Sequence, residues 1–213
     1  MTPAEFMKAV VRAYRLARAS RSPHPKVSRG RSHTVSSTAE DLLARFIAAN
    51  APRCDAVLVD QPLSFAQKDG RRLRFYPDLT VISGGEITAF VDLKMDIGWN
   101  RHGLADLCRA HQRMLLAARG KSCRLSDGAT KVSREVKVSK GVSYCVALMS
   151  RANIGGETLD RQLREARAMR PDVDVFVLCA RGANQYGLSS GAIFASLGVD
   201  HAEFERLLAK VIR

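Results

Sequence analysis

Several features that mark other protein classes are missing from this chain of 213 residues. Its longest uninterrupted apolar run, residues 175–180, has six residues, whereas a membrane-spanning helix needs ~18. The first ten residues include Glu5 and Lys8 and lack the apolar core of a secretory signal. With 46% hydrophobic residues the chain can still build a packed core. We therefore expect a soluble, cytoplasmic protein without a membrane partner.

Cysteine is present, but not in the patterns of a metal site. The five cysteines form no Cys-x-x-Cys pair, and the five histidines stand apart from them and from one another, so a zinc site is not expected. An odd number of scattered cysteines is typical of buried thiols in a reducing compartment. The spacing of a phosphate-binding loop and the nucleophile elbow of a serine hydrolase are also missing.

Positive charge, by contrast, is in excess. Thirty-four Lys and Arg residues against 21 Asp and Glu give a net charge of +13. This balance favours a polyanionic partner, most often nucleic acid, although a basic surface with no ordered partner would have the same composition. No acidic residue lies between Phe6 and Ala39. The candidate phosphate-binding residues are Lys8, Arg12, Arg15, Arg29 and Arg31 of this segment, together with Arg101.

The N-terminal region separates from the rest by composition. Thr2 to Glu5 is a capping box that predicts an amphipathic helix, and the Ser/Arg/Pro-rich stretch after it is typical of a basic arm. We expect a basic helix and arm in residues 1–34 and an α/β domain in residues 35–213. A second capping box, Ser37 to Glu40, predicts that the domain opens with a helix.

Three extended segments follow this second helix, separated by turn signals. They cover residues 55–65, 73–82 and 87–95, and their short connections predict an antiparallel meander. Beyond them the pattern predicts helices near 102–119 and 158–169, strands at 142–149 and 174–179, and a terminal helix capped by Asp200. The predicted fold class is α/β, with a mixed sheet and helices on both faces.

Two carboxylates and a lysine occupy neighbouring strands of the meander. Side chains alternate along a strand, so Asp92 and Lys94 share one face with Phe90. A three-residue loop at residues 84–86 would pair residue 78 with residue 92 and bring Asp78 onto the same surface. Adjacent carboxylates repel each other, and a divalent cation with a preference for oxygen, Mg²⁺ or Mn²⁺, relieves that repulsion.

Pro77-Asp78 and Asp92-Leu93-Lys94, in this order and on the second and third strands, resemble the motifs of the PD-(D/E)xK nuclease superfamily. The resemblance covers about residues 36–149 and implies a restriction-endonuclease-like core of α-β-β-β-α-β, here with an extra N-terminal helix. It implies a Mg²⁺-dependent endonuclease, with Mn²⁺ able to substitute. Asp78, Asp92 and the Leu93 carbonyl would hold the metal, and Lys94 would orient or help deprotonate the attacking water. The family often supplies another acid from the preceding helix, and Glu40 is the residue at that place.

Other interpretations of these residues stay open. Both motifs are short, and the chain repeats them at Pro171-Asp172 and Glu135-Val136-Lys137, although without the hairpin between them. Asp78 could be a turn residue, Asp92 and Lys94 an edge-strand salt bridge, and Glu40 a capping residue alone.

Three further residues and the choice of partner complete the expectations. His111 has the position of a core histidine, Trp99 could equally pack or touch substrate, and Asp96 is a reserve candidate for the site. DNA is favoured over RNA, in a restriction or defence role, and a homodimer is compatible with the sequence. One alternative function is a non-catalytic nucleic-acid-binding protein with a degenerate nuclease fold; another is a nuclease subunit that needs a partner or a small activator.

Overall fold

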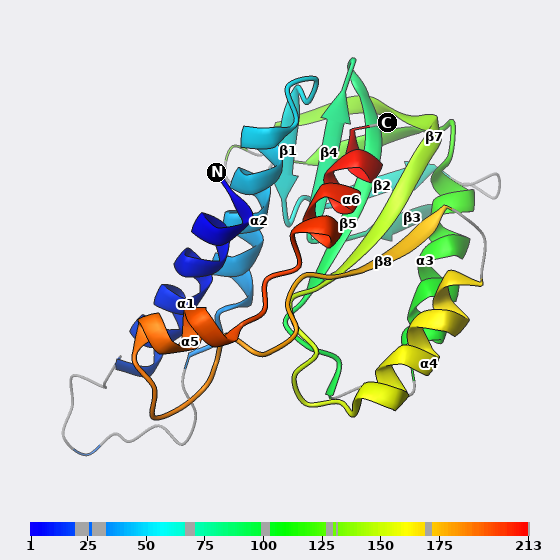
Figure 1. Cartoon of the computed structure of the whole chain (residues 1–213). Helices are drawn as coiled ribbons and strands as arrows, with labels where there is room; N and C mark the ends of the chain where they lie inside the picture. Colours follow the sequence, from blue (N-terminus) through cyan, green and yellow to red (C-terminus); the bar gives the residue numbers. More distant parts are fainter. Residues whose placement is uncertain are drawn as a thin grey trace.

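The computed structural model describes residues 1–19, 26, 33–66, 71–98, 103–126, 130, 132–168 and 172–212. Over these residues the chain has a mixed α/β fold, as predicted, with helices on both faces of one mixed sheet (Figure 1). The helices are α1 (Pro3–Ala19), α2 (Ser36–Asn50), α3 (Leu104–Ala118), α4 (Gly156–Arg167), α5 (Ser190–Ser196) and α6 (His201–Val211). The strands are β1 (Ala56–Val59), β2 (Leu63–Ala66), β3 (Arg72–Phe75), β4 (Leu79–Ser83), β5 (Glu86–Lys94), β6 (Ser122–Ser126), β7 (Ser133–Leu148) and β8 (Val173–Val177).

The sheet runs in the order β1-β4-β5-β7-β6-β2-β3, and β8 pairs with the second half of β7. Strands β1, β4 and β5 form the predicted antiparallel meander, and β5, β7 and β8 are parallel. Two predicted strands are each divided. Residues 55–65 break after Asp60, whose φ is +47°, and residues 73–82 break at Pro77, which cannot donate to a strand ladder. The two inner pieces pair as the hairpin β2–β3 at the far edge of the sheet.

The N-terminal helix is part of the core of the α/β domain. Phe6 of α1, Phe46 of α2 and Phe204 of α6 pack against one another, with ring centroids 5.1 to 5.8 Å apart. They cover the face of the sheet that carries Val91 and Leu93, while α3 and α4 cover the other face (Figure 1). The predicted boundary at residue 34 is therefore not a boundary of the packed core, because α1 shares that core.

The sheet curls back on itself at the β3 edge. In the sheet order β3 stands four strands away from β5, which in a flat sheet would be about 19 Å. The ring of Phe75 on β3 nevertheless lies 5.1 Å from Phe90 on β5 and 5.9 Å from Tyr144 on β7. The curl encloses an apolar interior and turns the opposite side of β2, β3 and β6 toward solvent.

Helix capping agrees with the sequence at two helices and differs at the third. At α1, the Thr2 and Glu5 side chains accept each other's backbone N–H groups at 3.1 and 2.8 Å, and at α6 Asp200 accepts from the Glu203 N–H at 3.1 Å. The capping box expected at Ser37 to Glu40 is wrong: α2 begins at Ser36, and its cap residue Val35 makes no side-chain cap bond. Glu40 is thus released from the capping role.

Two elements of the structure lie where the sequence predicted only loops. The basic stretch before β7 forms β6, so that β7 starts at Ser133 rather than near Val142, and α5 follows the last strand. The cysteines are free, and four of the five are buried, as predicted; burial raises the pKa of Cys108 and of Cys145 to about 12. None of the helices in the described ranges has both the length and the apolar character to span a bilayer.

Candidate functional site

The hairpin between β4 and β5 decides which residues of the two strands stand opposite each other. Its turn is two residues long rather than three: Gly84 and Gly85 have φ values of +58° and +73°, and Ser83 pairs with Glu86. This is the left-handed backbone that two-residue hairpins require and that glycine adopts at little cost. With this turn alone, every later pair would be displaced by one residue from the predicted register.

A bulge corrects the displacement. The register shifts between Val81 and Ile82, so that Thr88 is an additional residue on β5. Leu79 consequently pairs with Val91, and the next position places Asp78 opposite Asp92, as the sequence predicted. Register matters here because a one-residue slip would turn one carboxylate to the opposite face.

Asp78, Asp92 and Lys94 meet at one point at the end of β5. The Lys94 Nζ lies 3.4 Å from Asp78 Oδ2 and 3.3 Å from Asp92 Oδ2. The Leu93 N–H donates to Asp78 Oδ2 at 2.6 Å. Because the N–H and C=O of one strand residue point toward the same neighbour, the Leu93 carbonyl is directed to the same side, beyond the last pair of β4. Asp92 and Lys94 do form an ion pair, but not on an edge strand, since β5 lies between β4 and β7.

The charges of the three side chains oppose and compensate one another. Burial and the negative charge of Asp92 raise the pKa of Asp78, although Lys94 pulls it down. Burial would lower the pKa of Lys94, but the two carboxylates outweigh it, and the lysine pKa is raised. The site therefore holds a protonated lysine between two acids at neutral pH, with one negative charge left over when both acids are ionised.

Two aromatic side chains, Tyr144 and His111, contact the carboxylate of Asp92. The Tyr144 hydroxyl donates to Asp92 Oδ1 at 2.9 Å, and His111 Nε2 lies 3.1 Å from Oδ2 without the alignment of a hydrogen bond. The two rings are stacked, 4.1 Å apart and 13° from parallel. Burial alone would raise the pKa of Asp92, but the contacts with His111, Lys94 and Tyr144 lower it to about 2. Asp92 is thus a fixed, ionised carboxylate.

Glu40 reaches the same site from α2. A cleft of about 320 Å³ opens beside the carboxylates. Its lining residues are Ser36, Glu40, Asp78, Leu93, Lys94, Met95 and Asp96. Burial, followed by the negative charges of Asp78 and Asp60, raises the pKa of Glu40. Lys94 pulls the pKa of Glu40 down only in part, so Glu40 is a half-buried acid that faces other acids, which is a pattern found at functional sites.

The donor atoms fit a magnesium ion in type but do not form a closed cage. Within the described ranges, no three side chains of His, Cys, Asp or Glu are grouped closely enough to hold a metal ion by themselves. Mg²⁺ generally keeps several waters and takes only one or two protein carboxylates, with substrate phosphate completing the shell. Asp78, Leu93 and Glu40 line the cleft, and with the neighbouring Asp92 their oxygens would supply that kind of partial set.

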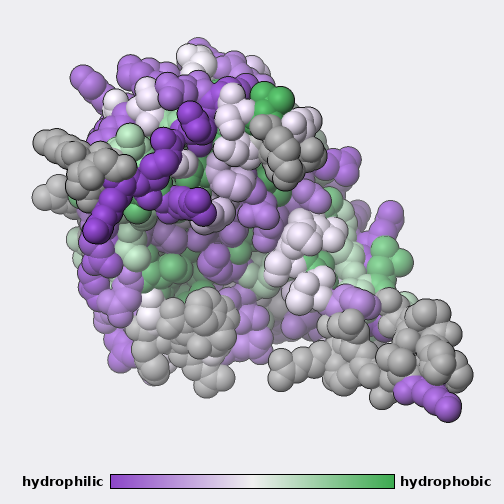
Figure 2. All heavy atoms as spheres, turned by 180° about the vertical axis from the view of Figure 1, so that it is seen from behind, coloured by the Kyte–Doolittle hydropathy of each residue, from purple (hydrophilic) through white to green (hydrophobic). Residues whose placement is uncertain are grey.

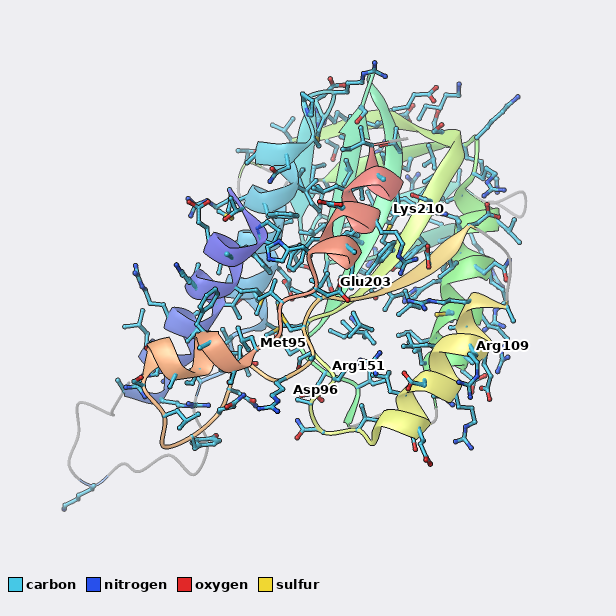
Figure 3. The ribbon with its side chains drawn as sticks, viewed as in Figure 1. Met95, Asp96, Arg109, Arg151, Glu203 and Lys210 are labelled. Carbon is cyan, nitrogen blue, oxygen red and sulfur yellow. The ribbon has the colours of Figure 1, made fainter. Side chains whose placement is uncertain are left out.

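Asp96, the reserve candidate for the site, has a structural role. Its Oδ1 accepts the Gly98 N–H at 2.9 Å, and its Oδ2 accepts from the Asn153 side-chain amide at 2.9 Å. Figure 3 shows Met95, Asp96 and Arg151 gathered where β5 and β7 end. Asp96 therefore joins the loop after β5 to the loop after β7, at the rim of the cleft.

The basic residues predicted to bind phosphate are placed in different ways. Lys8 Nζ lies 5.0 Å from the centroid of the Phe194 ring, and Arg15 donates to the Leu188 carbonyl at 3.0 Å. Arg12 is exposed on α1. Two cations of α1 thus already contact the α5 region of the protein. The remaining predicted residues, Arg29, Arg31 and Arg101, lie outside the described residues, as does Trp99.

Two residues of the site were not identified from the sequence. His111 was interpreted as an ordinary core histidine, and Tyr144 was not singled out. Tyr144 is the one aromatic residue in the apolar run 142–149, and a buried tyrosine hydroxyl needs a partner, so its position alone pointed to a polar group nearby. Comparison with known proteins adds no relative: no family model, no curated protein and no solved structure matches this chain.

Proposed function

We propose that the protein is a Mg²⁺-dependent endonuclease that hydrolyses phosphodiester bonds in DNA. The observation that carries the proposal is the convergence of Asp78, Asp92 and Lys94. Three residues that a short motif singles out in the sequence could have lain on opposite faces of the sheet. They instead meet beside a cleft, with the Leu93 backbone and Glu40 next to them.

The order of elements supports the restriction-endonuclease-like assignment. The series α2-β1-β4-β5-α3-β7 follows the α-β-β-β-α-β order of that core. The proline-aspartate motif directly precedes the second of these strands, and the acid-x-lysine motif ends the third. Hairpin β2–β3 is inserted between the first two core strands, and β6 before the last. The insertions leave the neighbour relations β1-β4-β5-β7 unchanged.

Asp78, Asp92 and the Leu93 carbonyl would hold the metal ion, and Glu40 would hold a second ion or a water. A bound Mg²⁺ would lower the pKa of a water ligand and neutralise negative charge on the phosphate. Lys94 stays protonated between its two acids, so it acts as a hydrogen-bond donor that orients the water and stabilises charge developing on phosphorus, rather than as the base. Glu40, whose pKa is raised, is the better proton acceptor in the cleft.

A second candidate function has its own supporting observation. Both carboxylate oxygens of Asp92 already contact protein groups: Tyr144 on one side, His111 and Lys94 on the other. A nucleic-acid-binding protein that has lost catalysis would retain an acid whose two oxygens both contact protein groups. Under this alternative the cluster stabilises the fold, and binding of nucleic acid needs no divalent cation.

Cleavage of supercoiled plasmid decides between the two candidates. We expect nicking by the wild-type protein in Mg²⁺, none with chelator, and a rate at least about 100-fold lower for Asp92→Asn, in keeping with loss of a metal ligand. Asp106→Asn, an exposed acid on α3, is the matched control and should cut normally. Equal nicking by wild type and Asp92→Asn would refute the endonuclease, and binding without cleavage under all conditions would favour the second candidate.

A further inference from the structure

The curl of the sheet produces a solvent-facing surface on β2, β3 and β6, which we call the outer β face. Alternation along each strand sends Leu63, Phe65 and Leu125 into the apolar interior and the residues between them outward. The outer β face consists of Ser64, Ala66, Arg72, Arg74, Ser122, Arg124 and Ser126. In Figure 1, β2 and β3 are the fainter strands at the back. Figure 2 shows that back side, with strongly hydrophilic side chains across its upper part.

The strand register places two arginines on either side of a serine. Ser64 is opposite Arg74 on one neighbouring strand and opposite Arg124 on the other, so the backbones of the two arginines are about 10 Å apart. Arg72, on β3 like Arg74, also reaches Ser64: its Nε donates to the Ser64 hydroxyl at 2.6 Å. Arg74 and Arg124 are both exposed. The result is a surface of guanidinium groups and small side chains.

The charge of the outer β face is positive and only partly offset at its border. It contains three arginines and no acid. The acid closest in register is Glu135 of β7, opposite Arg124, while Lys137 pairs with Glu86 at 2.7 Å. Arginine and serine are side chains that commonly contact DNA phosphates. The small serine and alanine side chains between the arginines leave room for a duplex backbone to reach the guanidinium groups.

The outer β face lies close to the carboxylate site along the chain. Arg74 is four residues before Asp78, and four extended residues span at most about 14 Å. A DNA strand carries one phosphate per ~3.4 Å of helix rise. The backbone of Arg74 therefore lies within about 14 Å of the backbone of Asp78, a separation that one DNA duplex bound to a small domain can span.

We propose that the outer β face binds the phosphate backbone of duplex DNA and positions the duplex for the carboxylate cleft. This inference rests on the proposed function and names the surface through which the substrate is held. It differs from the expectation that α1 holds the phosphates, because Lys8 and Arg15 of α1 contact Phe194 and Leu188 within the protein. Each arginine acts as a counter-charge to one phosphate and carries no sequence preference.

The test measures binding of the full chain to a short fluorescent DNA duplex in chelator, where no metal-dependent cleavage occurs, over a series of salt concentrations. For Arg74→Gln/Arg124→Gln we expect affinity to fall about tenfold or more and the slope of log K against log salt to become shallower by about 1.8, two contacts at ~0.9 each. Glu135→Gln should bind more tightly than wild type. Arg45→Gln/Arg113→Gln, which removes the same charge from exposed positions on α2 and α3, should keep the wild-type slope.

Two outcomes would overturn the inference: equal losses in the test and control variants, or a loss confined to Lys8→Gln/Arg12→Gln, which would place the duplex on α1. The proposed function is tested separately by cleavage. Mg²⁺-dependent nicking with an unchanged salt slope in Arg74→Gln/Arg124→Gln would leave the endonuclease standing without this surface. A shallower slope with no nicking by wild type would leave the surface standing without the enzyme.

Discussion

The ammonium of Lys94 lies 3.3 Å from a carboxylate oxygen of Asp92 and 3.4 Å from one of Asp78. The lysine thus occupies the space next to both acids that a metal ion would share. Its positive charge relieves the repulsion between the carboxylates in the absence of metal, and it competes with a cation for them. These two contacts separate the proposed role of Lys94 in cleavage from the proposed roles of Asp78 and Asp92 in metal binding.

Replacing Lys94 should accordingly abolish cleavage without abolishing metal binding. For Lys94→Gln we expect plasmid nicking to fall at least about 100-fold, because the donor that stabilises developing charge is lost. Affinity for Mn²⁺, measured by calorimetry, should be equal to wild type or higher, because the competing ammonium is gone. Lys140→Gln, at an exposed position on β7, serves as the control. Loss of Mn²⁺ binding in Lys94→Gln would contradict this division of roles.

Tyr144 should act as a positioning residue for Asp92, the proposed metal ligand. Tyr144→Phe removes the 2.9 Å hydrogen bond but keeps a ring to stack on His111. We expect the Kd for Mn²⁺ to rise about tenfold, the lower end of what groups behind a metal ligand contribute. Tyr76→Phe, an exposed tyrosine, should leave the Kd unchanged. An unchanged Kd in Tyr144→Phe would mean that the hydroxyl serves the fold alone.

Glu40 allows the capping role and the site role to be separated by experiment. A capping glutamate would cost about 1 kcal/mol on replacement, but α2 has no side-chain cap bond. For Glu40→Gln we therefore expect the free energy of unfolding to be unchanged or slightly higher, with nicking at least about tenfold slower. Chemical denaturation and the plasmid assay measure the two quantities, and Glu165→Gln on α4 is the control. A destabilised variant that cleaves normally would restore the capping interpretation.

The depressed pKa of Asp92 should be visible in the acid stability of the protein. Its pKa is about 2 in the folded protein and about 3.9 in an unfolded chain, so the unfolded state binds more protons between these values. Stability from this group is complete above about pH 4 and is lost as the pH falls toward 2, by about 2 to 3 kcal/mol. Asp78 and Glu40 have raised pKa values, so their ionisation lowers the stability of the fold as the pH rises. This loss falls at higher pH than the gain from Asp92, and the two contributions can be measured separately.

Urea denaturation of wild type and Asp92→Asn at a series of pH values measures this contribution. The variant should lose the steep part of the pH dependence between about pH 4 and 2, whereas Asp106→Asn should keep it. The same steepness in wild type and Asp92→Asn would show that Asp92 is not held as an ionised acid by its neighbours.

The sequence was sufficient for the core of the site because strand alternation and motif order are local properties. Phe90, Asp92 and Lys94 alternate on one strand, and a glycine turn joins that strand to the one that follows Asp78. The predicted register at Asp78 was correct although the predicted loop was one residue too long, since the bulge at Thr88 compensates. A bulge depends on how the whole sheet twists, which alternation along a single strand does not reveal.

What could not be predicted depends on contacts between distant segments. His111 and Tyr144 are 33 positions apart in the sequence, and only the packing of α3 on β7 stacks their rings against Asp92. The hairpin β2–β3 was hidden in two longer predicted strands, because Asp60 and Pro77 each interrupt what composition suggests is continuous. The outer β face follows from that hairpin and was equally invisible.

A crystal of the wild-type protein soaked in Mn²⁺ shows whether the carboxylate site holds a metal ion, because the anomalous signal of manganese locates the ion without reference to activity. We expect a peak within bonding distance of Asp78, Asp92 and the Leu93 carbonyl, with Lys94 moved away from at least one of the acids, and no peak in Asp92→Asn. Lys94 still between the two carboxylates at saturating Mn²⁺, with no ion beside them, would contradict this expectation.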